Sequence, residues 1–283
     1  MIAAPTTGIP TRPLGNTWRE VTLFGLGGEG VLRTHGRTPE AVRVIQRALD
    51  QGVNYFDTAP AYATSMDYYG AALGERRKGV FLACKTHDRT RDGSLRLLDD
   101  IFRRIKTNYL DLWQLHDLRD YDDLDMIFAR GGALEALKLA KADGRVRFLG
   151  ITGHHDPEIL MEAMRRFDFD TVLVALNAAD VHRLSFLKTV VPEAVRRGMG
   201  IIGMKSCAQG RLLSRGALSM DEAMSYVLSQ SGVSNVIVGC STPEEVDENA
   251  RIAREFSPFS DAKMRELEQR TQRNHALFGY FKK

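Results

Sequence analysis

The sequence has few cysteines, and none of them form a pattern that would pair them or bind a metal through them. Its three cysteines, Cys84, Cys207 and Cys240, are scattered through 283 residues, and no Cys-x-x-Cys motif is present. We therefore expect no disulfide framework, zinc finger or iron–sulfur cluster. Each cysteine follows an apolar run, so we interpret all three as small core residues near strand ends.

The sequence also lacks a strong net charge and a long apolar run. Lys and Arg total 39 and Asp and Glu total 36, which gives a formal net charge of only +3. Because a nucleic-acid face needs a concentrated basic stripe, we expect no nucleic-acid partner. No apolar run reaches the roughly 18 residues of a membrane span, and residues 1–13 lack the regions of a signal peptide. We expect a cytoplasmic protein with no membrane partner.

What the sequence does contain is an ordinary globular composition and a repeated strand–helix pattern. Hydrophobic residues make up 43% and charged residues 27% of the chain, as in folded domains. Eight short apolar runs are followed by helical patterns. They cover residues 21–26, 53–56, 80–85, 110–115, 148–152, 171–175, 200–204 and 235–238. We expect helices over residues 66–75 and from the Asp-rich linker 117–125 to about residue 142, among others.

This alternation predicts parallel strands joined by right-handed crossovers. Eight units favour a closed (β/α)8 TIM barrel, which typically takes about 250 residues. An open sheet is less favoured because no GxGxxG follows an early strand. We therefore predict one barrel domain over residues 1–283, with an N-terminal β-hairpin over residues 11–19 and an extra C-terminal helix over residues 260–275. The tail over residues 277–281 is expected to pack near the barrel mouth.

Four reactive side chains follow neighbouring predicted strands. Asp57 ends the second strand, with Tyr62 on the loop after it. Lys85 ends the third strand, and His116 follows the fourth. Chemistry in such barrels lies at the C-terminal strand ends, and neighbouring strands are about 4.8 Å apart, so the four groups should converge. Each one alone has an ordinary structural explanation, but four at matching strand ends favour a site.

The residue types suit protonation of a carbonyl oxygen while a bound cofactor supplies a hydride. A nearby ammonium lowers the pKa of a phenol, so we expect Lys85 to lower the pKa of Tyr62. Asp57 would keep Lys85 charged and in place. His116 can donate a hydrogen bond to the substrate oxygen without carrying a charge.

The same residues carry a resemblance to a known family. The segment Asn54–Tyr62 (NYFDTAPAY), together with Lys85 and His116, resembles the Asp, Tyr, Lys and His signature of the aldo-keto reductases. Gly144–Ile151 resembles the entry to that family's fifth strand, and the likeness extends over residues 11–254. It implies NADPH, less often NADH, bound across the barrel mouth and a small carbonyl substrate. It also implies reversible reduction of an aldehyde or ketone to an alcohol, with Tyr62 as general acid and base.

The resemblance further implies cofactor contacts, with several departures from the usual pattern. Thr152-Gly153 and Leu173 stand where the family has Ser-Asn and Gln for the nicotinamide amide, and Met204 replaces the stacking aromatic. The usual basic residue for the 2′-phosphate is absent after Gly239, which leaves Lys205, Arg211 or Arg251 as substitutes. The expected cofactor-binding residues are Gly27, Thr152, Gly153, His154, Asn177, Met204, Lys205, Ser206, Gly210, Gly239, Ser241, Thr242, Glu245, Glu248 and Asn249.

Two other functions remain as alternatives. The missing amide ligands slightly favour a nicotinamide-binding sensor or regulatory protein with little turnover, and the complete set of four catalytic groups argues against it. A metal-dependent hydrolase is suggested by the pair His154-His155, with Asp57, His87 and His116 as further ligands. Such barrels generally need a His-x-His at the first strand, which is absent. We therefore expect no metal and interpret His154 as lining the nicotinamide pocket. The pattern specifies neither the substituents of the substrate nor an oligomeric state.

Overall fold

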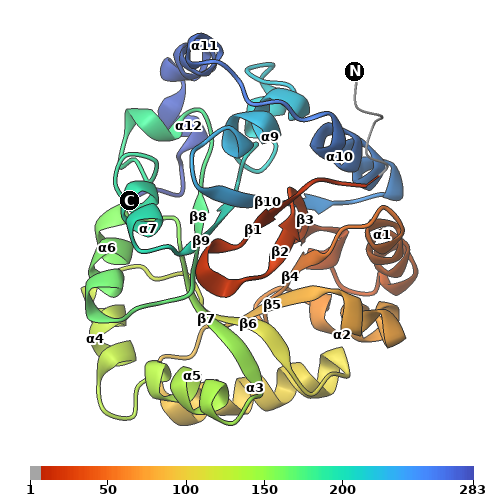
Figure 1. The fold of residues 1–283 in the computed structure, drawn as a ribbon, viewed down its shortest axis with the longest axis vertical. Helices are drawn as coiled ribbons and strands as arrows, with labels where there is room; N and C mark the ends of the chain where they lie inside the picture. Colours follow the sequence, from red (N-terminus) through yellow and green to blue (C-terminus); the bar gives the residue numbers. More distant parts are fainter. Residues whose placement is uncertain (1–7) are drawn as a thin grey trace.

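A closed barrel of eight parallel strands forms the centre of the computed structural model, which describes residues 8–283 (Figure 1). Around the barrel the strands follow the order β10-β3-β4-β5-β6-β7-β8-β9. The predicted (β/α)8 fold is therefore confirmed. Residues 1–7 lie outside the described residues. They are part of the segment 1–13, which we interpreted as lacking the regions of a signal peptide.

The barrel strands agree with the predicted runs except at the first one. They are β3 (Phe24–Gly30), β4 (Tyr55–Asp57), β5 (Phe81–Thr86), β6 (Leu110–Leu115), β7 (Val146–Gly153), β8 (Thr171–Ala175), β9 (Gly200–Met204) and β10 (Val233–Cys240). The prediction that the first barrel strand begins at residue 21 was wrong. Residues 20–22 belong to the hairpin, and the backbone changes course at Thr22, whose hydroxyl donates to the Phe24 carbonyl.

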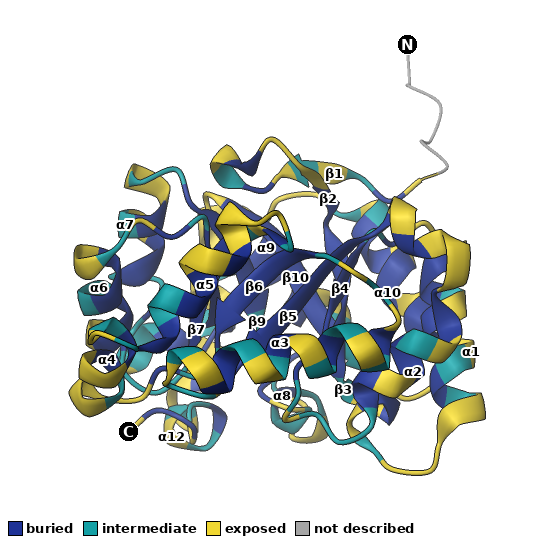
Figure 2. Cartoon of the chain, turned by 90° about the horizontal axis from the view of Figure 1, so that it is seen from below, coloured by how far each residue is buried: buried dark blue, intermediate teal, exposed yellow. Residues whose placement is uncertain are grey.

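The N-terminal hairpin closes the end of the barrel at which the strands begin. Its strands β1 (Thr11–Pro13) and β2 (Glu20–Thr22) pair antiparallel. Asn16 N donates to the Gly198 carbonyl at 2.8 Å, just before β9, and Leu14 is fully buried. Figure 2 shows β1 and β2 on the opposite side of the molecule from α8 (Arg211–Ser214) and α12 (His275–Phe278). The other end of the barrel is left for a site.

The remaining helices surround the barrel. They are α1 (Thr38–Asp50), α2 (Ser65–Ala72), α3 (Arg91–Ile105), α4 (Tyr121–Phe128), α5 (Ala133–Ala142), α6 (Pro157–Arg166), α7 (Val190–Arg196), α9 (Met220–Leu228), α10 (Pro243–Glu255) and α11 (Asp261–Gln272). Their buried stripes pack on the strands, as Val44, Ile45 and Ala48 of α1 do.

Three predicted helix boundaries differ in the structure. Helix α2 ends at Ala72, and a 3-10 turn (Gly74–Gly79) follows it. The expected linker is in part helical, because the Asp120 side chain accepts a hydrogen bond from Asp123 N and thereby begins α4. That helix and α5 are separate, with Gly132 between them, where a Cβ would lie 2.4 Å from the Ile127 carbonyl oxygen. The predicted C-terminal helix is α11, and it ends at Gln272.

Apolar side chains from six of the eight barrel strands fill the barrel interior, and bulky residues usually occupy these positions in this fold. Tyr55, Phe81, Leu112, Leu173, Ile202 and Ile237 form this inner cluster with Leu14 of the hairpin. The interior is therefore packed rather than open. Within residues 8–283, none of the helices combines the length and apolar character needed to cross a membrane.

The C-terminal tail returns to the end of the barrel at which the strands finish. Lys282 forms an ion pair with Asp180 in which both side chains are almost completely buried. The Phe281 carbonyl oxygen lies 2.9 Å from His155 Nδ1, and the Phe281 ring lies 5.5 Å from Lys205 Nζ. The expected packing of the tail near the barrel mouth is therefore observed.

Candidate active site

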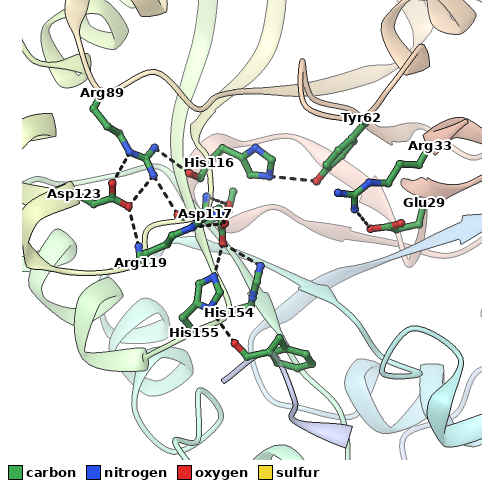
Figure 3. Close-up of polar contacts among 12 residues, drawn as sticks. Glu29, Arg33, Tyr62, Arg89, His116, Asp117, Arg119, Asp123, His154 and His155 are labelled. Atoms are coloured by element: carbon green, nitrogen blue, oxygen red, sulfur yellow. Dashed lines mark hydrogen bonds and ion pairs between the residues drawn. The ribbon is translucent and has the colours of Figure 1, made fainter. Parts of the chain in front are cut away.

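The four predicted catalytic side chains meet at the C-terminal ends of β4, β5 and β6. Lys85 Nζ lies 2.5 Å from Asp57 Oδ1 and donates to the Thr58 carbonyl at 3.0 Å. The Lys85 ammonium also lies over the Tyr62 ring, 4.8 Å from its centroid. Figure 3 shows Tyr62 and His116 facing each other, with 3.5 Å between Tyr62 Oη and His116 Nε2.

Burial sets the protonation states of these groups. It raises the pKa of Tyr62 above its ordinary value, and the charge of Lys85 opposes that rise. Lys85 acts on Tyr62 in the expected direction and lowers its pKa, but desolvation of the phenolate raises the pKa by more, so the net shift is upward. Burial, followed by the charge of Lys85, holds the pKa of His116 well below its usual range. Tyr62 is thus a phenol and His116 a neutral imidazole at neutral pH.

Asp57 and Lys85 form a buried ion pair, each with about 1% of its surface exposed. Burial favours the neutral amine, but the charge of Asp57 and its hydrogen bond to Lys85 oppose this effect, and the pKa of Lys85 lies above its ordinary value. The ammonium is therefore retained beneath the phenol, where it can stabilise a phenolate formed by proton transfer.

Arg89 fixes the backbone that carries His116. Its guanidinium donates to the His116 carbonyl at 3.0 Å and to the Asp117 carbonyl at 3.1 Å. Asp123, at the start of α4, accepts two further hydrogen bonds from Arg89, at 3.0 and 2.8 Å. This bidentate pair leaves Arg89 little freedom, so the turn after β6 is held rigidly.

These four candidate catalytic groups line a cavity of about 1070 Å³ at this end of the barrel. Small-molecule pockets usually measure about 300–1,000 Å³, so a ligand as large as a dinucleotide fits. All four predicted catalytic residues line it. So do most of the predicted cofactor residues, namely Gly27, Thr152, His154, Met204, Lys205, Ser206, Gly210, Gly239, Ser241, Glu245, Glu248 and Asn249.

Three predicted cofactor residues do not line the cavity as residues 8–283 form it: Gly153, Asn177 and Thr242. The Asn177 amide is used inside the protein, since it donates to the Lys205 carbonyl at 3.2 Å and accepts from Ala179 N at 2.9 Å. A Cβ on Gly153 would point at Leu160 of α6. Thr242 instead caps α10, with its hydroxyl accepting from Glu245 N.

The loop between β9 and α8 has a backbone suited to an anion. Lys205, Ala208, Gln209 and Gly210 all have positive φ, between 50° and 81°. Successive amides in such a winding backbone can form an anion-binding concavity. The Lys205 side chain also lines the cavity, and burial lowers its pKa. These residues fit the phosphates of a nicotinamide dinucleotide.

Several residues of the site were missed from the sequence. Gly28 and Arg89 line the cavity beside the catalytic groups, as do Glu29 and Asp117. The sequence shows a glycine pair after an apolar run. It does not show that residue 28 must lack a side chain, because that requirement depends on the position of the Tyr62 ring in the folded protein. Asp117 follows His116 directly, and its left-handed backbone, with φ 58°, turns its carboxylate toward His154. No spacing rule predicts that turn.

Comparison with known proteins places the chain among known families: the model for the aldo/keto reductase family matches residues 24–222. The L-galactose dehydrogenase of Arabidopsis thaliana is 27% identical over 88% of this chain and 90% of its own. The D-threo-aldose 1-dehydrogenase of a Pseudomonas species is 24% identical over 89% of this chain and 90% of its own. The holo form of aldo-keto reductase AKR11C1 from Bacillus halodurans has the same fold, with a TM-score of 0.78 at 23% identity over 93% and 96% of the two chains.

Proposed function

Because the chain belongs to the aldo/keto reductase family, we propose that it reduces an aldehyde or ketone to an alcohol with NADH or NADPH, reversibly. The observation that carries this proposal is the convergence of Tyr62, Lys85, Asp57 and His116 on one cavity. The experiment that tests it is multiple-turnover oxidation of the reduced cofactor with a panel of carbonyl compounds.

Tyr62 is the proposed proton donor. When bound, the reduced nicotinamide would supply a hydride to the carbonyl carbon, and the Tyr62 hydroxyl would give its proton to the carbonyl oxygen. The phenolate left behind would be stabilised by Lys85, whose ammonium Asp57 holds in place. Oxidation of the alcohol runs the same transfers backwards, with the phenolate as base.

His116 is the proposed orienting group. As a neutral imidazole 3.5 Å from the Tyr62 hydroxyl, it can donate a hydrogen bond to the oxygen that Tyr62 protonates. Its position depends on Arg89, which binds the backbone carbonyls of His116 and Asp117. A substrate oxygen between Tyr62 and His116 would therefore meet two fixed donors.

The charge at the adenosine end of the cavity favours NADH over the NADPH that the resemblance implied. By this end we mean the start of α10, next to Gly239, where the resemblance implies the 2′-phosphate. Glu245 and Glu248 of α10 line the cavity there, and a carboxylate suits a ribose hydroxyl better than a phosphate. Two of the suggested basic substitutes are engaged elsewhere: Arg251 pairs with Glu255, and Arg211 lies over the Tyr280 ring. Of the three suggested residues, only Lys205 lines the cavity. We therefore propose tighter binding of NADH than of NADPH.

Polar groups beside Tyr62 favour a hydroxylated substrate. Arg33 lies over the Tyr62 ring, 5.1 Å from its centroid, and pairs with Glu29; both side chains are nearly half exposed to the cavity side. Such groups can exchange their hydrogen bonds for those of substrate hydroxyls. Two of the relatives above carry the names of sugar dehydrogenases, which agrees with this proposal. A higher kcat/KM for glyceraldehyde than for propanal would support it, and the reverse order would contradict it.

A further inference from the structure

Three side chains beside the catalytic cavity bring one polar atom each to a common point. Asp117 follows β6, and His154 and His155 follow β7. Asp117 Oδ1 lies 3.0 Å from His154 Nε2 and 3.2 Å from His155 Nε2 (Figure 3). One atom from each of these residues falls within 4.8 Å of the other two. The catalytic mechanism uses none of the three.

The C-terminal tail determines which nitrogen of His155 faces Asp117. His155 Nδ1 lies 2.9 Å from the Phe281 carbonyl oxygen. Because a carbonyl only accepts, Nδ1 must carry the hydrogen, and Nε2 of the neutral ring is then a lone pair. Nε2 lies 3.2 Å from Asp117 Oδ1, so the nitrogen that is not used by the tail is the one available to an ion.

The surroundings offer these atoms no other partner. Among residues 8–283, the buried atoms Asp117 Oδ1 and His155 Nε2 have no hydrogen-bond partner. A buried polar atom without a partner is costly, and a cation shared by the three side chains would remove that cost.

We propose that Asp117, His154 and His155 bind one divalent first-row transition-metal ion, of the kind that Zn²⁺ represents. Imidazole nitrogen and carboxylate oxygen are the ligands that such ions accept. With metal–ligand distances of about 2.1 Å, donor atoms 3.0–3.2 Å apart subtend angles of roughly 90–100° at the ion, between the octahedral and tetrahedral values. The separations therefore suit a common ion.

The groups behind the ligands fit the same assignment. Arg119 donates to Asp117 Oδ2 at 2.9 Å, leaving Oδ1 for the ion, and the Phe281 carbonyl orients His155. Such outer partners fix ligand direction in metal sites. Asp117 is itself held through its amide, which donates to Thr152 Oγ1 at 2.8 Å. The carboxylate is therefore positioned before any ion arrives.

The proposed metal site is open to the catalytic cavity and lies near two positively charged side chains. Asp117 and His154 both line the cavity, so a fourth position can take water or a ligand, as in open zinc sites. The charges of Arg119 and Lys205 lie nearby, which weakens binding compared with a closed four-ligand site. Through His155 and Phe281, the bound ion would tie the C-terminal tail to the barrel mouth.

This site differs from the metal site of the hydrolase alternative that we considered from the sequence. That alternative joined the two histidines to Asp57, His87 and His116, and we rejected it for want of a His-x-His at the first strand. In the structure Asp57 is instead paired with Lys85. The proposed ion lies outside the proton-transfer path, so the inference stands independently of the proposed reaction.

The test is a Zn²⁺ titration of the full-length, chelator-treated protein, monitored by competition with a chromophoric chelator. We expect one Zn²⁺ per chain, with affinity reduced more than about tenfold in His155→Ala and in Asp117→Asn. His35→Ala removes an exposed histidine elsewhere, and Cys207→Ser removes the partly buried thiol that lines the cavity. Both control variants should bind Zn²⁺ as the wild type does.

Absence of saturable 1:1 binding to the wild-type protein would overturn the proposal, as would binding that both cluster variants retain. Loss of binding in Cys207→Ser would also overturn it, because it would move the ion to the thiol. If a cluster variant fails to fold, the absorption spectrum of the Co²⁺-loaded wild type decides. Bands of a nitrogen and oxygen site without thiolate charge transfer support the assignment, and thiolate bands contradict it.

Discussion

Gly28 lies directly against the ring of Tyr62: a Cβ at residue 28 would come within 2.3 Å of Tyr62 Cδ2 and 2.5 Å of Cε2. Real Cβ atoms do not approach other atoms so closely, so the absence of a side chain at residue 28 lets the phenol occupy its place over Lys85. A backbone glycine of β3 thus decides the position of the proposed proton donor.

Gly28→Ala is therefore expected to displace Tyr62 and slow turnover. A misplacement of about 1 Å at a reacting group can cost on the order of 100-fold in rate. The measurement is kcat for carbonyl reduction, with Gly79→Ala as the matched control, because a Cβ there meets nothing within 4 Å. Equal kcat in Gly28→Ala and wild type would show that the contact does not position the phenol.

Asp57→Asn should destabilise the fold as well as slow the reaction, because it leaves the Lys85 ammonium buried without its partner. Removing one member of a buried pair typically costs about 3–5 kcal/mol of unfolding free energy. Asp247→Asn is the control, because both side chains of its pair with Arg47 are 41% exposed and such pairs contribute roughly 0–1 kcal/mol. Urea denaturation of the two variants gives the comparison, and similar losses in both would contradict the buried-pair account.

The protein is expected to lose stability as pH falls below about 6.5, the ordinary pKa of histidine. The pKa of His116 is held well below that value by burial and by Lys85, so the unfolded chain binds a proton that the folded chain does not. One such group lowers the unfolding free energy by up to about 1.4 kcal/mol per pH unit on acidification.

The check is the slope of unfolding free energy against pH between pH 7 and 5 in wild type and His116→Gln. The variant should have the shallower slope. Some pH dependence of the unfolding free energy should remain, because burial also lowers the pKa of His154. Identical slopes would mean that His116 is not held neutral in the folded protein.

Glu245→Lys should shift cofactor preference toward NADPH. The substitution replaces a carboxylate at the adenosine end of the cavity with an ammonium that can meet the 2′-phosphate. We expect the Kd for NADPH to fall relative to that for NADH by about tenfold, corresponding to roughly 1.4 kcal/mol, measured by quenching of cofactor fluorescence. An unchanged Kd ratio would place the 2′-hydroxyl away from Glu245.

The sequence was sufficient to predict the barrel and the convergence of the four candidate catalytic side chains, since both follow from local patterns. Asp57, Lys85 and His116 each stand at the end of a predicted strand, and parallel strands bring their C-terminal ends together. Residues 21 and 22 were misassigned because a hairpin strand and a barrel strand follow each other without an intervening loop. Periodicity alone does not separate two such strands.

Other parts of the site depend on long-range geometry that no local pattern encodes. Asn177 was expected to contact the cofactor. Its side-chain amide instead donates a hydrogen bond to the Lys205 carbonyl, which joins the loop after β8 to the loop after β9. Asp117 joins His154 only because its backbone is left-handed. The pKa of Tyr62 likewise depends on burial in the finished fold, which adjacent residue types do not reveal.

The central claim is that Tyr62 supplies the proton for carbonyl reduction, and Tyr62→Phe tests it most directly. The variant keeps the ring that packs on Gly28 and Lys85 and removes only the hydroxyl. We measure multiple-turnover oxidation of NADH and NADPH with a panel of carbonyls, together with cofactor affinity by fluorescence titration. Loss of a general acid typically costs about 10²–10⁴-fold in rate, so the account predicts a fall in kcat of that size with unchanged cofactor affinity. Turnover by Tyr62→Phe at the wild-type rate would contradict it, as would a wild-type protein that binds the cofactor and turns over none of the carbonyls.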